Sequence, residues 1–207
     1  MRPKPLSTQA RKRPKQARSQ ETVTAILQAT ARVLVDTGYE KASTNRIAEV
    51  AGVSIGTLYQ YFPNKAALVA ALVDLHVEQM RETFTGLLRD LGEAPLPRAV
   101  GVMIHAIVAS HQVEPELHRV VIQQLPSVGG RERVEAFQAF CQAVVETWLS
   151  MNARRVRPRN HRLAAFVLVH SVDAIVHAAV LEGATFLKDE ALEAEVAELV
   201  LRYLSPE

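Results

Sequence analysis

The chain has 207 residues, of which 48% are hydrophobic and 22% are charged, so it can bury a sizeable core and is not a largely disordered protein. A single cysteine, Cys141, excludes an intramolecular disulfide and a cysteine-based zinc cluster. The net charge of +2 hides an asymmetry. Residues 1–18 carry seven basic side chains and no acidic one, which leaves 17 basic against 22 acidic residues, a net of −5, in the remainder. This distribution predicts a polyanionic partner met near the N-terminus.

Residues 1–18 also contain Pro3, Pro5 and Pro14 and almost nothing apolar. We predict a disordered basic arm, which either contacts DNA phosphates or is a solvated tail without a role. No apolar stretch follows the charged start, so we expect no signal peptide and a cytoplasmic protein.

The first helical pattern runs from Ser19 to Thr37, where apolar residues recur at spacings of three and four. Gly38 then fits the position just past a helix C-terminus. Two short helices are expected next, at Thr44–Ala51 and from Ser54 to about Phe62. Their end signals are N-cap serines, a turn glycine and a proline stop, at Ser43, Ser54, Gly52 and Pro63.

Two short helices joined by a tight turn have the shape that fits a DNA major groove. Apolar residues fall where such a unit buries side chains, at Ile47, Ala51, Val53, Leu58 and Tyr61. Ala48 and Gly52 are small enough to let the two helices cross closely. The outward positions of the second short helix are small or polar apart from Ile55 and the amphipathic Tyr59, namely Ser54, Ile55, Gly56, Thr57, Tyr59 and Gln60.

The same stretch carries a specific pattern. It has Ile47-Ala48, then AGVSIGTLYQYF from Ala51 to Phe62, then Lys65 and Leu68. Over about residues 20–70 it resembles the DNA-binding domain of TetR/AcrR-family transcriptional regulators. The resemblance implies that some of these side chains hold phosphates, at Ser43, Thr44, Tyr59, Tyr61 and Lys65. It implies that others lie against base edges, at Ser54, Gly56, Thr57 and Gln60.

Two of these positions have other readings. Tyr61 could instead pack between helices, and Lys65 could be a solvated lysine in the first turn of the next helix.

The rest of the chain also reads as helical, with no convincing strand. We expect helices at Asn64–Leu91, 97–112, Pro115–Gln124, Arg131–Arg154, Asn160–Leu187 and Asp189–Leu204. The fold class is therefore all-α, with about nine helices. The predicted domains are the arm at 1–18, a three-helix helix-turn-helix domain at 19–65, and a helical dimerisation and effector-binding domain at 66–207.

The last two helices carry more apolar surface than one subunit easily hides. We expect them to form a homodimer through a four-helix interface, which resembles what the family does. The stretch Leu163–Leu181 is long enough to span a membrane, but His170, Asp173 and His177 near its middle favour a buried helix of a soluble protein. We therefore expect no membrane partner.

The family resemblance implies that an effector enters the body between its middle helices. The residues that would line such a site are Met103, Ile107, His111, Phe137, Phe140, Cys141, Val144, Trp148, Phe166 and His170. They could equally just fill the core. Because they are mostly apolar, an effector would be hydrophobic or aromatic and largely uncharged.

His170, Asp173 and His177 share a helical face, which could bind a metal or decorate a dimer interface. Cys141 could sense redox state, although a buried thiol is usually inert. No catalytic motif is present, so we expect no enzyme activity, no metal and no cofactor. The predicted function is a ligand-responsive repressor that binds a palindromic DNA operator as a homodimer. The alternatives are an effector-independent DNA-binding adaptor or architectural protein and, more remotely, a metal-dependent enzyme.

Overall fold

The computed structural model describes residues 17–91, 94–112, 115–125, 128, 131–183 and 190–206. Within these ranges there are nine α-helices and no strand, which confirms the all-α prediction. The helices are α1 (Ala17–Lys41), α2 (Thr44–Val50), α3 (Ile55–Tyr61), α4 (Lys65–Asp90), α5 (Leu96–Gln112), α6 (Pro115–Gln124), α7 (Arg131–Met151), α8 (His161–Glu182) and α9 (Glu190–Leu204). Residues 1–16 of the expected basic arm lie outside the described part of the chain.

Most helix ends follow the local signals. Gly38 has φ 72° and ψ 167° and breaks the helical geometry where the predicted helix was to end, but α1 as a whole continues to Lys41. Phe62 is extended at φ −125°, as expected before a proline.

Two predicted helix ends were wrong. α8 stops at Glu182 rather than Leu187, because Gly183 takes the left-handed conformation and its N–H bonds to Ala179 and Val180. α7 stops at Met151 rather than Arg154. There the buried Asn152 donates to the Trp148 carbonyl at 3.0 Å and closes the last turn.

The chain forms two compact units, and the boundary between them falls inside α4. The first unit contains residues up to His76 together with Glu116–Arg133, and the second contains Val77–Pro115 and Val134–Glu207.

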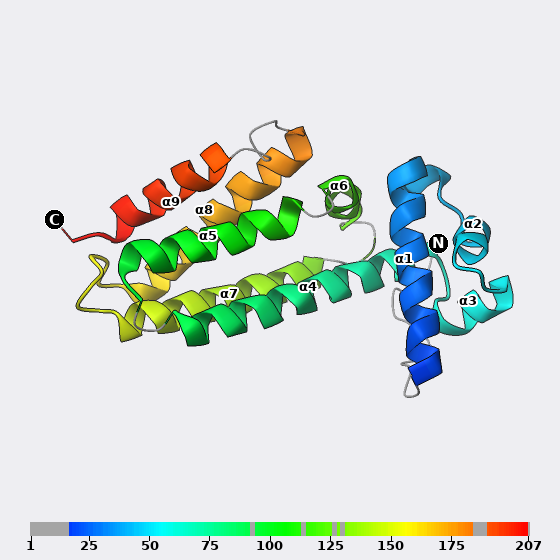
Figure 1. Cartoon of the computed structure of the whole chain (residues 1–207), viewed down its shortest axis with the longest axis horizontal. Coiled ribbons are helices and arrows are strands. Elements are labelled where there is room, and N and C mark those ends of the chain that lie inside the picture. The colour runs from blue at the N-terminus through cyan, green and yellow to red at the C-terminus, as the bar shows by residue number, and fades with distance from the viewer. Residues whose placement is uncertain are drawn as a thin grey trace, which may run out of the picture. The chain divides into compact units, whose positions relative to one another are not determined.

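The first unit is built on α1, with α2 and α3 side by side along one flank (Figure 1). The apolar faces of these helices and of the start of α4 meet in one core. Its fully buried members include Ile26, Leu34, Ile47, Leu58 and Leu68. α6 contributes Leu117 and Val120 to the edge of this core.

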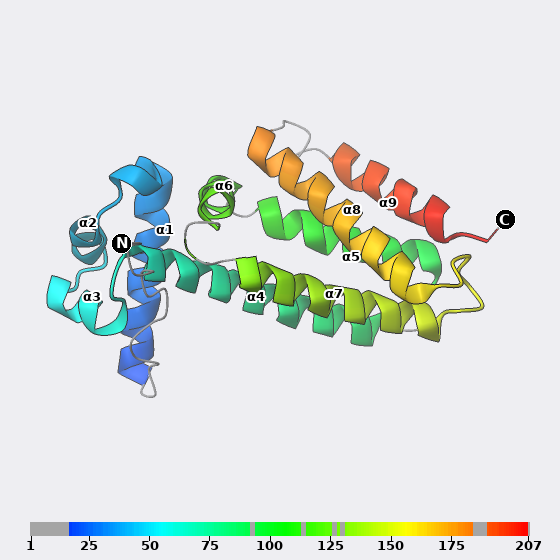
Figure 2. The same ribbon diagram turned by 180° about the vertical axis from the view of Figure 1, so that it is seen from behind.

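The second unit is organised around α5, which contacts α9 and α8. Its core gathers apolar side chains from these three helices and from the segment after α7, including Val108, Val156, Ala165, Val176 and Val196. The second half of α4 runs along α7 in both views (Figures 1 and 2). Phe84 and Phe137 join these two helices, with ring centroids 6.3 Å apart.

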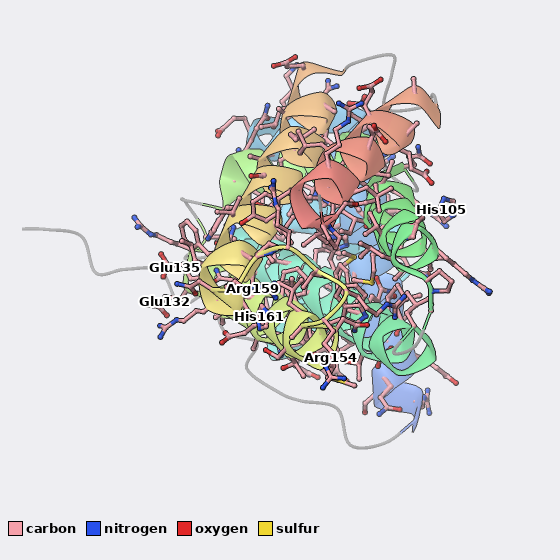
Figure 3. The ribbon with its side chains drawn as sticks, turned by 90° about the vertical axis from the view of Figure 1, so that its left-hand side faces the viewer. His105, Glu132, Glu135, Arg154, Arg159 and His161 are labelled. Atoms are coloured by element: carbon pink, nitrogen blue, oxygen red, sulfur yellow. The ribbon has the colours of Figure 1, made fainter. Side chains whose placement is uncertain are left out.

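The segment between α7 and α8 is rich in arginine. The Arg155 guanidinium makes two hydrogen bonds within the second unit. It donates to the Ala94 carbonyl at 2.7 Å and to the Asn152 side chain at 3.0 Å. Figure 3 labels Arg154 and Arg159 of this segment and His161, the first residue of α8. His161 lies 3.1 Å from the Ser150 hydroxyl, which links the start of α8 to the end of α7.

One flank of α8 packs into the core of the second unit, whereas the opposite flank is apolar and exposed. Leu163 and Phe166 keep 56% and 50% of their surface accessible. We call this flank the exposed α8 stripe, defined by Leu163, Phe166, Val167, Ala174 and Leu181. By length and composition α8 could also cross a membrane, a test that core helices of soluble proteins pass as well.

Candidate functional site

The helix-turn-helix unit packs as its sequence predicted. Ile47 of α2 and Leu58 of α3 are fully buried. Ala51, Val53 and Tyr61 are partly buried against the same core. This packing fixes the angle between α2 and α3 and thus the direction in which the outer face of α3 points.

Both short helices begin at a capping serine. The Ser43 hydroxyl accepts the backbone N–H of Arg46 at 3.2 Å, and the Ser54 hydroxyl accepts that of Thr57 at 3.0 Å. The hydroxyls of Ser54 and Thr57 also bond to one another at 2.8 Å. These serines hold the first turns in place, and their hydroxyls remain on the exposed side of the unit.

The two glycines of this unit serve different needs. Gly52 has φ +68°, a conformation that other residues rarely adopt, yet a Cβ there would meet nothing within 4 Å. Our expectation that Gly52 allows the helices to cross closely was therefore wrong, because the turn alone requires it. Gly56 is helical, and a Cβ there would meet only the Ser54 hydroxyl, at 3.7 Å. Packing within the first unit does not explain a glycine at position 56.

The outer face of α3 is exposed and polar. The side chain of Gln60 makes no hydrogen bond to the described residues. Its amide can therefore form hydrogen bonds with the edge of a DNA base. The Tyr59 hydroxyl lies 3.0 Å from the Thr44 hydroxyl of α2 and is partly exposed. The structure thus brings two predicted phosphate contacts, Thr44 of α2 and Tyr59 of α3, together on the exposed side of the unit, whereas Tyr61 packs partly against the core.

Lys65 is placed differently from the rest. Its ammonium group donates to the backbone carbonyls of Tyr39 and Ala42, the latter at 3.0 Å, and lies 4.1 Å from the centre of the Tyr39 ring. It therefore closes the C-terminal end of α1, where carbonyls lack helical partners. Phosphate binding by Lys65 remains a prediction, alongside this structural role.

The predicted effector residues on α7 form a half-buried apolar row. We call it the α7 stripe, which consists of Phe137, Phe140, Cys141, Val144 and Trp148. The only fully buried residue of α7 is Leu149, and this helix is described throughout. Apolar side chains that keep part of their surface accessible are what a ligand-binding helix needs. Met103 and Ile107 of α5 are likewise half-buried.

Polar side chains link α7 to α8. The Gln138 amide donates to Asp173 Oδ2 at 3.2 Å, and the Gln142 amide lies 3.2 Å from His170 Nε2. His177 Nδ1 lies 3.4 Å from Asp173 Oδ1. Sequence reasoning missed both glutamines, although their spacing of four residues on a helix with an apolar stripe was a usable signal.

Two predicted effector residues take other places. Phe166 belongs to the exposed α8 stripe, whereas we expected it to line the interior, and its ring contacts that of His170 at 4.4 Å. His111 is buried, its Nδ1 lies 2.8 Å from the Ile107 carbonyl, and its ring is 5.2 Å from that of His177.

Burial is the largest influence on the pKa values of Cys141, in the α7 stripe, and of Asp173, which faces α7. Burial and the nearby Asp173 carboxylate raise the pKa of Cys141 to about 12. Burial alone would raise the pKa of Asp173, but hydrogen bonds from His177 and Gln138 and the charge of His177 outweigh it, so this pKa lies below its usual value. The thiol is thus neutral and the carboxylate is ionised at neutral pH.

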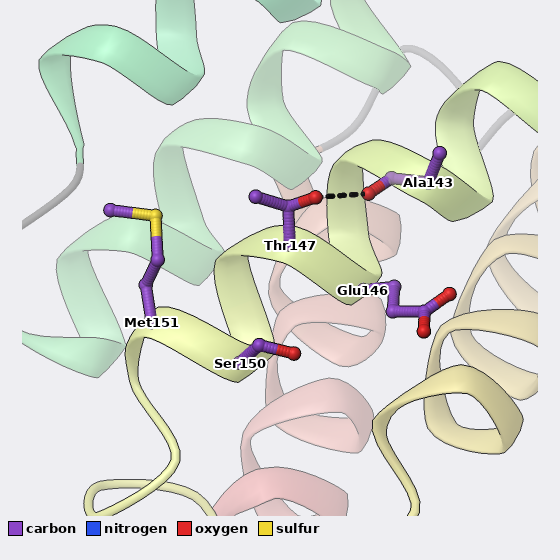
Figure 4. A pocket seen from close by; sticks show the side chains of 5 residues that line it. All are labelled: Ala143, Glu146, Thr147, Ser150 and Met151. Atoms are coloured by element: carbon purple, nitrogen blue, oxygen red, sulfur yellow. Dashed lines mark hydrogen bonds between the residues drawn. The ribbon is translucent and has the colours of Figure 1, made fainter.

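A surface hollow lies apart from these residues. It is lined by Ala143, Glu146, Thr147, Ser150 and Met151, all on α7 (Figure 4). None of the predicted effector residues belongs to it.

Comparison with known families agrees with this geometry. Residues 26–72 match the family model described as bacterial regulatory proteins of the tetR family. Residues 95–204, more than half of the chain, match the tetracyclin repressor-like C-terminal domain. The chain belongs to the TetR family. The fold class and the family that we expected are therefore confirmed.

Similar proteins carry related names. An uncharacterized HTH-type transcriptional regulator of Mycobacterium tuberculosis is 35% identical over 86 residues, 42% of this chain and 43% of the relative. The chain thus spans less than half the length of that relative. The regulator BetI of Cronobacter sakazakii is 28% identical over 172 residues, 78% of this chain and 80% of BetI. The structure of SmeT of Stenotrophomonas maltophilia has a TM-score of 0.71 at 21% identity, covering 91% of this chain and 93% of SmeT.

Proposed function

We propose that this TetR-family regulator is a homodimeric repressor that binds a palindromic operator and is released by a small apolar or aromatic effector. The observation that carries the DNA-binding part is the outer face of α3. There Gln60 is exposed, and Gly56 is a glycine that the packing of the unit does not require. Glycine at this position permits close approach of α3 to a groove floor.

The DNA contacts divide by chemistry. Ser43, Thr44, Tyr59 and Tyr61 supply hydroxyls to phosphates, and Lys65 supplies charge. Ser54, Gly56, Thr57 and Gln60 lie against the bases, where the amide of Gln60 can bond bidentately to adenine. The basic residues of positions 1–18 either add phosphate contacts or form a solvated tail without a role.

A dimer is the second part of the proposal. The exposed α8 stripe offers aliphatic and aromatic surface that water solvates poorly, and a second copy of the chain would cover it. One α3 reads few base pairs, so two copies related by a dyad would read a palindrome. Its half-sites would be about 34–36 Å apart.

Effector release is the third part. The half-buried α7 stripe supports it, and so does a structural neighbour: SmeT, the repressor of a multidrug efflux pump, has been solved as a complex with triclosan. An effector releases DNA only if it binds the released conformation more tightly than the DNA-bound one. We place this regulator in the cytoplasm.

DNA binding is tested first by selecting bound fragments from genomic DNA and measuring the affinity of the best fragment for two variants. Gln60→Ala should weaken binding about tenfold to a hundredfold and relax the preference at one base position in each half-site. Gln28→Ala removes an exposed glutamine from α1 and should change nothing. Equal affinity of Gln60→Ala and the unmodified protein would refute the assignment of this face.

Effector response is tested by a thermal-shift screen of small molecules, followed by a DNA-release assay for each hit. Apolar or aromatic hits that also release the operator support the repressor. A broad screen without hits would favour an adaptor that binds DNA without an effector.

A further inference from the structure

Asp173 is a carboxylate held in a half-buried position between α7 and α8. Gln138 of α7 donates to its Oδ2 at 3.2 Å, and His177 Nδ1 lies 3.4 Å from its Oδ1. Its side chain keeps 34% of its surface accessible, so a small molecule can reach it. Gln138 and His177 therefore fix the position of the carboxylate, which is still partly accessible to solvent.

The carboxylate has binding capacity to spare. Its two oxygens can accept about four hydrogen bonds, and the described residues supply two partners, Gln138 and His177. Of these two, Gln138 is neutral and His177 is charged only when protonated. No lysine or arginine among the described residues forms an ion pair with Asp173. The charges of His177 and His111 help to lower the pKa of this carboxyl, but neither histidine is a permanent cation, so the ionised carboxylate favours a positively charged ligand.

The surroundings define the rest of that ligand. The ring of Phe137 lies 6.3 Å from the ring of Phe140 and 6.3 Å from that of Phe84, so the two half-buried rings of α7 are backed by the buried ring of Phe84 on α4. Arg81 lies 4.5 Å over the Phe140 ring. Because the Arg81 guanidinium covers this face of the Phe140 ring, it would repel a cationic ligand there. The cationic group of a ligand would therefore bind at Asp173.

We propose that the effector is an organic cation, an aromatic or apolar body with an amine or quaternary ammonium group, whose charge is balanced by Asp173. This inference rests on the effector response proposed above and narrows its ligand class. An anion of the same shape would be repelled, and a neutral molecule would gain only the contacts of the α7 stripe.

The test compares three probes of similar size by isothermal titration calorimetry. They are benzyltrimethylammonium, its neutral carbon isostere neopentylbenzene, and the anion benzenesulfonate. The unmodified protein should bind the cation at least about tenfold more tightly than the isostere and should not bind the anion. Asp173→Asn keeps the shape of the side chain and should remove the preference. Glu193→Gln neutralises the carboxylate of α9 that pairs with His105, and should keep the preference.

The outcomes separate this inference from the proposed function. If neutral molecules bind and release the operator without any preference for charge, the inference is wrong and the effector response stands. If no probe binds at about 1 mM, the inference is also wrong, and the effector response is then decided by the broad screen.

A third result would reassign Asp173. If Asp173→Asn leaves cation binding unchanged but raises the dimer dissociation constant, the carboxylate is an interface group, and the inference is overturned. Circular dichroism of each variant checks that the helices are retained.

Discussion

The hydroxyl of Tyr59 lies 3.0 Å from the hydroxyl of Thr44, 15 residues earlier in the chain. One belongs to α3 and the other is the first residue of α2, so the bond joins the two helices on their exposed side. Both hydroxyls are predicted phosphate contacts. Their bond holds the two hydroxyls in one arrangement, which would reduce the conformational entropy lost if they bind a phosphate.

Tyr59→Phe tests this arrangement. Because the bond is exposed, its loss should change the free energy of unfolding by less than about 1 kcal/mol. Operator affinity should fall by about tenfold or less, and to the same degree for all sequences, because a phosphate contact carries no base preference. In a double-mutant cycle with Thr44→Val, the effects on DNA affinity should not add. Strict additivity would show that the two hydroxyls act independently.

Lys65→Met tests the capping role of the lysine. Loss of charged hydrogen bonds to the α1 carbonyls should reduce the free energy of unfolding by about 1–3 kcal/mol, as measured by urea denaturation. Lys41→Met removes an exposed lysine of α1 and should have little effect. If Lys65 instead serves only DNA, the variant would keep its stability and lose about one unit from the salt dependence of operator binding.

The two glycines of the helix-turn-helix should respond oppositely to alanine. Gly52→Ala should destabilise the protein by about 1 kcal/mol or more, because φ is +68° there. Gly56→Ala should stabilise it by up to about 1 kcal/mol through helix propensity, yet weaken operator binding. Thermal unfolding and DNA affinity check the pair. Normal operator binding by Gly56→Ala would mean that α3 does not approach DNA closely at this position.

Leu163→Glu and Phe166→Glu test the exposed α8 stripe as a dimer interface. Each should raise the dimer dissociation constant by at least about tenfold, measured by analytical ultracentrifugation, because a charge replaces apolar surface that the partner would cover. Met151→Glu is the matched control, since Met151 is 72% exposed but lies on α7 outside the stripe. A dimer that tolerates both stripe variants would place the interface elsewhere.

Cys141 should be unreactive in the folded protein. Burial and Asp173 raise the pKa of its thiol to about 12, so almost no thiolate exists at pH 8. Alkylation by iodoacetamide at this pH should be at least about a hundredfold slower than for free cysteine, and should become fast in urea. Rapid labelling of the native protein would revive a redox-sensing role.

Local signals in the sequence predicted most of the helix-turn-helix. Serine caps, the glycine turn and the proline stop act within a few residues, so they can be read without knowing the partners of a segment. The spacing of Ile47 and Leu58 similarly identified the core face of α2 and α3 before any packing was known. The helices of the described residues were predicted from the spacing of apolar residues. That spacing reflects the number of residues per helical turn, which is a property of the backbone.

Other features depended on the tertiary structure. Lys65 caps carbonyls more than 20 residues away, and Gln138 meets Asp173 across 35 residues. Phe166 lies on the outside of α8, although its apolar character suggested the interior. A sequence shows which residues share a helical face, but the rotation and neighbours of each helix decide what that face meets. The sequence by itself therefore predicted which side chains of α2 and α3 would face DNA, because caps and apolar spacing act locally, whereas the packing of α7 against α8 decided which side chains lie together at the proposed effector site.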